Sequence, residues 1–136
     1  MADYSKYQHL ATMTGADYYL IDTDIILIVP PKGFLDTPKQ ARESAEFQSA
    51  YARKLGKKIA TMVVMSNVLS QDAETRRIYN DQPASGLYYG AVLVVDNALS
   101  RALASFLIGM SQTKVPVKLF DSVEKGINWL RTIRPE

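Results

Sequence analysis

Three polar side chains, Asp96, Asn97 and Arg101, follow an apolar run and could bind an anion. The run, Leu87 to Val95, consists mainly of Val, Leu, Tyr and Ala, which is typical of a strand buried on both faces. Ligands of open α/β sheets bind outside the carboxyl ends of the strands, where these three side chains should gather. We therefore predict a candidate ligand or anion site at this turn.

Arg101 carries most of that prediction. It falls in the first turn of the helix expected after Asp96 and Asn97, where a cation opposes the helix dipole at a cost of about 0.3–1 kcal/mol. A bound anion would offset the cost, and so would a local salt bridge to Asp96 that holds the turn. The sequence leaves both interpretations open.

The composition removes several other kinds of chemistry. The chain has no cysteine, so disulfides, zinc–thiolate sites and thiol chemistry are excluded. His9 is the single histidine, which excludes a metal site with several histidine ligands. The patterns of a nucleophile elbow, a P-loop and a dinucleotide-binding loop are absent. We expect no catalytic residues, no metal and no cofactor, although scattered carboxylates could still meet in a cleft.

The charges and the N-terminal residues narrow the class of protein further. A formal net charge of +2 is too small to indicate a nucleic-acid partner. Basic pairs such as Arg76-Arg77 fit solvated helix faces, and no aromatic residues alternate with them to stack on bases. The N-terminus has no basic region followed by an apolar one, as a secretory signal would. We expect a cytoplasmic protein without a nucleic-acid partner.

The stretch from Ala91 to Met110 is long and apolar enough to suggest a membrane span. About nine Leu, Ile, Val and Phe residues contribute roughly −0.3 to −0.6 kcal/mol each to insertion, whereas Asp96 and Arg101 cost about +2.5 to +3.5 kcal/mol each. The charges cancel the gain, so we expect no span. The period changes after Asp96, which predicts a strand, a capped turn and a helix. The apolar face of that helix is Leu99, Leu103, Phe106, Leu107 and Met110.

Similar signals organise the first half of the chain. Tyr18 to Asp22 and Ile25 to Pro30 are apolar runs around a short polar turn, typical of a hairpin. A capping-box sequence and a terminating glycine then delimit a helix with apolar residues at four-residue spacing. These signals are Thr37, Pro38, Gln40 and Gly56, and the apolar residues are Phe47, Tyr51 and Leu55.

The second half continues the alternation. Ile59 to Met65 predicts a third buried strand, and Ser70 is expected to cap a helix that runs to about Asn80. Val115 to Phe120 predicts a last strand that is an edge strand or carries Pro116 at its start. Asp121-Ser122-Val123-Glu124 reads as a second capping box. The core face of the last helix is Val123, Ile127, Leu130 and Ile133.

The predicted order of elements is ββαβαβαβα. This order predicts a single α/β domain over residues 18–136, with a mostly parallel sheet, an N-terminal hairpin and packed helices. Residues 1–17 are expected to form a polar N-terminal segment outside the domain, which could be flexible.

The sequence contains the segments AETRRIYN (73–80), YYGAVLVVDNALSRALASFLIG (88–109) and PVKLFDSVEKGINWL (116–130). Together these segments resemble the STAS domain of anti-sigma-factor antagonists, and more closely a group of small bacterial STAS/CRAL-TRIO-like proteins of unknown function. The resemblance covers the chain from about residue 18 and implies a STAS-like fold.

The resemblance also implies a position for regulation. STAS antagonists carry a regulatory serine between the third strand and the next helix, where this chain reads MSNVLSQDAE (65–74). Ser70 is the nearest match and Ser66 the second, so both are candidate phosphoacceptors. The acidic residue, second serine and glycine that accompany the family's serine are missing here.

We therefore expect a non-catalytic, STAS-like regulatory module that binds a protein partner or a second copy of itself. The alternative is a small carrier or sensor that binds an apolar or anionic ligand near the turn from Asp96 to Arg101. An interaction module needs an exposed apolar patch. A carrier needs a pocket of a few hundred Å³.

Overall fold

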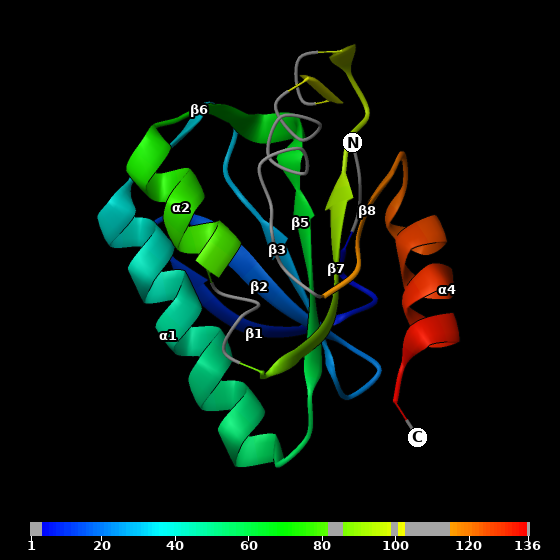
Figure 1. Ribbon diagram of the computed structural model, residues 1–136. Coiled ribbons are helices and arrows are strands. Elements are labelled where there is room, and N and C mark those ends of the chain that lie inside the picture. Colours follow the sequence, from blue (N-terminus) through cyan, green and yellow to red (C-terminus); the bar gives the residue numbers. More distant parts are fainter. Residues whose placement is uncertain (1–3, 82–85, 99–100, 103–114, 136) are drawn as a thin grey trace.

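The computed structural model describes residues 4–81, 86–98, 101–102 and 115–135. A six-stranded mixed sheet in the order β1-β2-β3-β5-β7-β8 forms its centre (Figure 1). Strands β1, β2 and β3 pair antiparallel, and β3, β5, β7 and β8 pair in parallel. The strands are β1 Gln8–Met13, β2 Ala16–Ile21, β3 Ile25–Val29, β5 Ile59–Val64, β7 Tyr88–Val94 and β8 Val117–Phe120.

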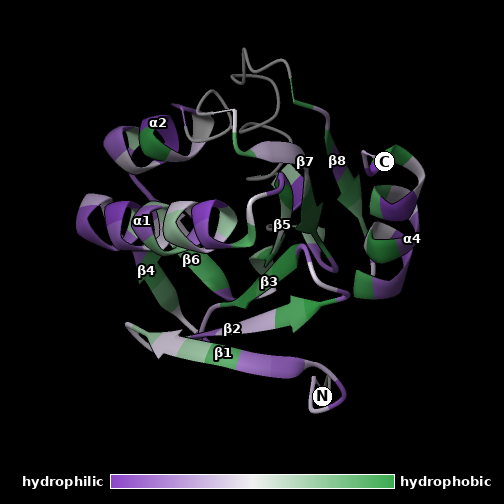
Figure 2. Ribbon diagram, turned by 90° about the horizontal axis from the view of Figure 1, so that it is seen from below, coloured by the Kyte–Doolittle hydropathy of each residue, from purple (hydrophilic) through white to green (hydrophobic). Residues whose placement is uncertain are grey.

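Two further strands form a separate parallel ribbon, β4 Phe34–Asp36 and β6 Val68–Gln71. Helices α1 and α2 cover one face of the sheet and α4 covers the other (Figure 2). The helices are α1 Pro38–Leu55, α2 Ala73–Asp81 and α4 Val123–Ile133, with the short 3₁₀ helix η1 Met65–Asn67 between β5 and β6. The domain is therefore α/β with a mostly parallel sheet, as predicted.

Alternation along the central strands builds a core on each face of the sheet. In β3, Ile25 and Leu27 join the core beneath α4, whereas Ile26 and Ile28 join the core beneath α1. Ile127 and Leu130 of α4 complete the first core. Each fully buried side chain of this size contributes about 1.5–3 kcal/mol, so the two cores supply most of the driving force for folding.

The local signals of the sequence are confirmed at several points. The predicted hairpin is formed by β2 and β3. Thr37 and Gln40 make the reciprocal capping box of α1, and Gly56 ends that helix with a left-handed φ of 73°. Pro116 precedes β8, which lies at an edge of the sheet.

The predicted order lacked β1, β4 and β6. Strand β1 lies within residues 1–17, the segment expected outside the domain, and pairs with β2 through a register that shifts between His9 and Ala11. The hydrophobic pattern of the sequence does not reveal β4 and β6, because they have three and four residues and stabilise each other across a long sequence separation. A run this short has no period of its own.

Two predicted helix caps are wrong. Ser70 belongs to β6, opposite Leu35, and Asp72 caps α2 instead, because its carboxylate accepts from the Thr75 N–H at 2.8 Å. The cap of α4 is the Ser122 hydroxyl, which accepts from the Lys125 N–H at 3.2 Å. Asp121, the first residue of the predicted capping box, instead pairs with the Lys125 ammonium at 2.9 Å.

The apolar face predicted for the helix after Asp96 lies outside the described residues. That face is Leu99, Leu103, Phe106, Leu107 and Met110. Within the described part of the chain, no helix has the length and apolar character needed to cross a bilayer.

Helix α4 approaches the sheet closely at Gly126. A Cβ atom there would lie 2.8 Å from Val92 Cγ1 and 3.0 Å from Met62 Cε, and both neighbours are fully buried. We expect Gly126→Ala to destabilise the fold by about 1–3 kcal/mol through overpacking, although alanine is the better helix former by about 1 kcal/mol. Urea unfolding followed by circular dichroism measures this change. The exposed Asn128→Ala in the same helix is the control, and equal stability of both variants would contradict the close packing.

Candidate functional site

The predicted site at Asp96, Asn97 and Arg101 forms an exposed turn after β7. The Asn97 amide donates to Asp96 Oδ1 at 3.4 Å, and the Arg101 N–H donates to the Asn97 carbonyl at 3.0 Å. The turn has a neighbour from the start of the chain, because burial and the nearby Asp96 carboxylate raise the pKa of Tyr4. The structure thus brings the three residues into one turn, and their anion-binding role stays a prediction.

The two candidate phosphoacceptors differ in access. Ser70 is exposed on β6. Ser66 lies in η1, where its hydroxyl oxygen is buried with no hydrogen-bond partner among the described residues. A modifying enzyme can therefore reach Ser70 more readily than Ser66.

The ribbon of β4 and β6 exposes apolar side chains on its outer face. Leu35 is 59% exposed and Leu69 is 57% exposed. The inner side is packed, because Phe34 and Val68 contact a small core that also contains Val95. The packed inner side of the ribbon therefore fixes the positions of the two exposed leucines.

A buried carboxylate anchors the same ribbon. Asp36 at the end of β4 is 7% exposed, and its Oδ2 accepts from the Gln71 amide of β6 at 2.9 Å. The hydroxyl of Tyr79 in α2 also hydrogen bonds to Asp36. Burial raises the pKa of Asp36 while these donors oppose the rise. Asp36 thus ties β4, β6 and α2 together.

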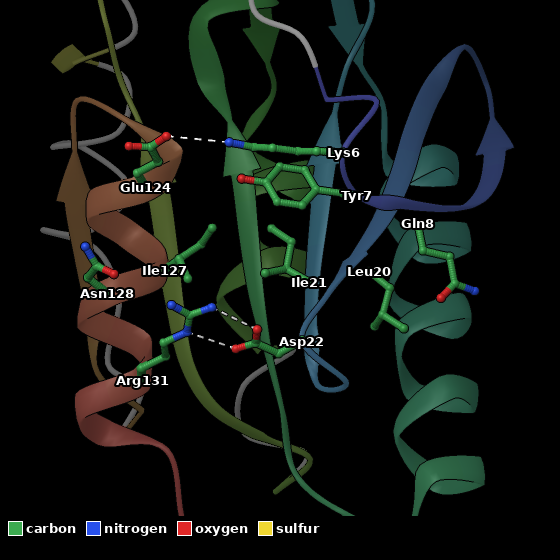
Figure 3. Close-up of a pocket in the computed structure, with 10 residues that line it drawn as sticks. All are labelled: Lys6, Tyr7, Gln8, Leu20, Ile21, Asp22, Glu124, Ile127, Asn128 and Arg131. Atoms are coloured by element: carbon green, nitrogen blue, oxygen red, sulfur yellow. Dashed lines mark hydrogen bonds and ion pairs between the residues drawn. The ribbon is translucent and has the colours of Figure 1, made fainter.

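A groove of about 430 Å³ separates α4 from the N-terminal segment and β2 (Figure 3). One wall is a single stripe of α4, since its residues are spaced three and four apart. The stripe is Glu124, Ile127, Asn128 and Arg131, and the opposite wall is Lys6, Tyr7, Gln8, Leu20, Ile21 and Asp22. The groove therefore lies along the seam between two parts of the chain that are distant in sequence.

Ion pairs cross the groove at both of its ends (Figure 3). At one end Lys6 Nζ lies 3.5 Å from Glu124 Oε1, and both side chains are more than half exposed. At the other end Arg131 binds Asp22 with two hydrogen bonds, Nε to Oδ2 at 3.1 Å and Nη2 to Oδ1 at 2.9 Å. The first pair is loose, whereas the second has the paired geometry that favours strong guanidinium–carboxylate binding.

Asp22 belongs to a larger ionic cluster at the hairpin turn. Arg134 Nη2 donates to Asp22 Oδ2 at 2.6 Å, and Arg134 Nε lies 2.8 Å from Asp24 Oδ2. Hydrogen bonds from Arg131 and Arg134 lower the pKa of Asp22 to about 2. The Tyr89 hydroxyl donates to Asp24 at 3.2 Å. This cluster joins the end of α4 to the turn between β2 and β3.

His9, Thr12 and Asp17 form a polar cluster across β1 and β2. His9 Nε2 lies 3.0 Å from Thr12 Oγ1 and 3.1 Å from Asp17 Oδ1, and the Thr12 hydroxyl donates to Asp17 at 2.6 Å. A nucleophile relay needs the acid on the ring nitrogen opposite the nucleophile. Both contacts fall on one nitrogen here, so this cluster lacks the geometry of such a relay.

No group of three His, Cys, Asp or Glu side chains in the described ranges could hold a metal ion.

Residues 19–134 match the family described as Domain of unknown function (DUF7793). The chain belongs to this family. No curated protein matches the chain. The matched residues include the ribbon, α4 and part of the opposite wall of the groove, from Leu20 to Asp22, whereas β1 and the groove residues Lys6, Tyr7 and Gln8 precede them.

Sequence reasoning missed the groove of this DUF7793 chain because three of its lining residues fall within residues 1–17. The polar members of the α4 stripe were a usable signal. Asn128 and Arg131 lie beside Ile127 on α4, so this face of the helix extends beyond the part that contacts the core. The ribbon was missed with its strands, and the exposure of Leu35 and Leu69 is visible only after β4 and β6 pair.

The depressed pKa of Asp22 makes the cluster sensitive to acid. A carboxylate with a lowered folded-state pKa adds stability above its unfolded pKa and loses it as the pH falls toward the folded value. We expect Asp22→Asn to cost about 1–2 kcal/mol at pH 7, since exposure of Arg131 screens part of the interaction. The difference from wild type should vanish between about pH 4 and pH 2.

Urea unfolding at several pH values measures both effects. Asn tolerates the left-handed conformation that Asp22 adopts, with a φ of 57°, so the backbone should not be strained. Asp121→Asn, which breaks an exposed pair with Lys125, is the control and should cost less. A stability loss for Asp22→Asn that persists unchanged at pH 2 would contradict the electrostatic origin.

Proposed function

We propose that this DUF7793 chain is a non-catalytic, STAS-like interaction module whose partner surface is the outer face of the β4–β6 ribbon. The observation that carries the proposal is the joint exposure of Leu35 and Leu69 on neighbouring strands. Single exposed leucines are common on protein surfaces, but neighbouring ones form a patch that a partner can cover. A cytoplasmic location is part of this proposal.

The position of Ser70 supports the same surface. Ser70 lies opposite Leu35 in the ribbon and directly follows Leu69. The resemblance to STAS antagonists implies a regulatory serine between a strand and the next helix, and Ser70 lies in β6, between β5 and α2. Because fold resemblance alone does not establish function, the exposed leucines are the stronger support.

The anchoring of the ribbon supports a role in recognition. The buried Asp36 connects β4 to β6 and α2, and Asn67 donates to the Pro30 carbonyl at 2.9 Å. These contacts hold the leucines in place before a partner binds. A surface ordered in advance loses less conformational entropy on binding.

The proposal predicts that the double variant Leu35→Ser, Leu69→Ser loses its partner. Wild-type and variant chains are used as bait in extracts of the source cells, and bound proteins are quantified by mass spectrometry. For the double variant, we expect the captured amount of at least one protein to fall about tenfold or more. Removing two anchor side chains commonly costs more than 1 kcal/mol of binding free energy. Sedimentation of the same variants tests whether the partner is a second copy.

Asn128→Ser on α4 is the control for that experiment, because it changes an exposed residue outside the ribbon, on a helix that covers the other face of the sheet from α2 (Figure 2). Circular dichroism confirms that each variant is folded. Unchanged capture and unchanged sedimentation of the folded double variant would contradict the proposed surface.

The proposal also predicts that a charge at Ser70 weakens the interaction. Ser70→Asp places a carboxylate beside the two leucines, so an apolar partner must desolvate a charge. We expect partner capture or self-association to fall about fivefold or more for Ser70→Asp and to stay near wild type for Ser70→Ala. If aspartate and alanine at this position behave alike, the regulatory role of Ser70 is refuted.

A further inference from the structure

The groove along α4 has the size of a small-molecule site. Its volume of about 430 Å³ falls within the usual range for such pockets. Glu124 and Arg131 lie seven residues apart on the helix, so the groove is about 10 Å long between its ionic ends. An elongated ligand with distinct ends fits this shape better than a compact ion.

The two acidic residues of the groove are not equally available to a ligand. Asp22 is engaged by the guanidinium groups of Arg131 and Arg134. Glu124 is 77% exposed and has a 3.5 Å contact with Lys6. An exposed pair of this kind contributes little, so Glu124 can rotate toward solvent at low cost. A cationic ligand would have to compete with Lys6 or with two arginines.

Hydrogen-bond donors are better placed. Lys6 carries an ammonium group at the end of the groove where Glu124 lies, and the Tyr7 ring extends between the walls (Figure 3). At the far end, the third guanidinium nitrogen of Arg131 points away from Asp22 (Figure 3). The available groups therefore favour an anion over a cation.

The floor of the groove is apolar. Ile21 is 3% exposed and Ile127 is 6% exposed, and both belong to the core beneath α4. In Figure 3 their side chains lie between the two ionic ends. Because both side chains are already almost completely buried, the partly buried Tyr7 ring between the walls supplies the apolar surface that an organic body would cover (Figure 3).

We propose that the groove binds a small organic carboxylate, with its carboxylate at Lys6 and its apolar body against the Tyr7 ring, beside Ile21 and Ile127. On binding, Glu124 turns to solvent and Lys6 exchanges its partner for the ligand. This site is independent of the β4–β6 ribbon, so its failure would leave the proposed partner surface intact.

The test uses probes that share a body and differ in charge. Octanoate and octylammonium, each below the concentration at which it forms micelles, are titrated into the full chain and followed by NMR. Acetate and inorganic phosphate supply the charge without the body. We expect octanoate to shift the amide resonances of Tyr7, Ile127 and Asn128, and to bind at least tenfold more tightly than the other three probes.

Variants then locate the carboxylate. Lys6→Gln should weaken octanoate binding about fivefold, and Glu124→Gln should tighten it about twofold because a competing anion is removed. Lys125→Gln is the matched control, since Lys125 is an exposed lysine on the same helix that pairs with Asp121 outside the groove. All of these side chains are exposed, so the fold should be unaffected.

Three results would overturn the proposal. Octylammonium that binds as tightly as octanoate would show that the site does not select an anion. Equal losses for Lys6→Gln and Lys125→Gln would show a general charge effect. Resonance shifts confined to the region of Leu35 and Leu69 would place the ligand on the ribbon.

Discussion

The central strands β3, β5 and β7 are buried on both faces, and this constraint organises the rest of the molecule. Each face must be covered along its full width. On one side the long helix α1 supplies the cover with Ala52 and its neighbours. On the other side α4 lies over β5, β7 and β8, and Tyr4 and Tyr7 pack against the remainder of the same core. The groove lies on this second face, between α4 and the N-terminal residues.

Ion pairs fix the distance between the two walls of the groove at one end. The guanidinium groups of Arg131 and Arg134 reach from the end of α4 to the carboxylates of Asp22 and Asp24 at the hairpin turn. Because one wall of the groove is α4 and the other continues from that hairpin, the cluster fixes both walls. The looser pair of Lys6 and Glu124 leaves the opposite end adjustable. One end of the groove is thus fixed and the other can open.

The sequence predicts those parts of the fold that depend on local signals. Thr37 and Gln40 predict the start of α1, and the apolar run at Ile25 to Ile28 predicts β3. Ser70 shows where local reasoning fails, because Ser70 and Asp72 both have capping chemistry and the pairing of β6 with distant β4 decides between them. Tyr7 reaches its site only through tertiary packing, so no pattern within residues 1–17 reveals it. The Asp96 turn was predictable because one continuous segment builds it.

The shifted register of β1 has a consequence for how the protein avoids aggregation. Strand β1 is an end strand of the sheet, and its pairing with β2 is interrupted between His9 and Ala11. An irregular strand makes a poor template for the strand of another molecule. The opposite end strand, β8, has four residues and begins after a proline. Both borders of the sheet are therefore poor templates for edge-to-edge pairing with another molecule.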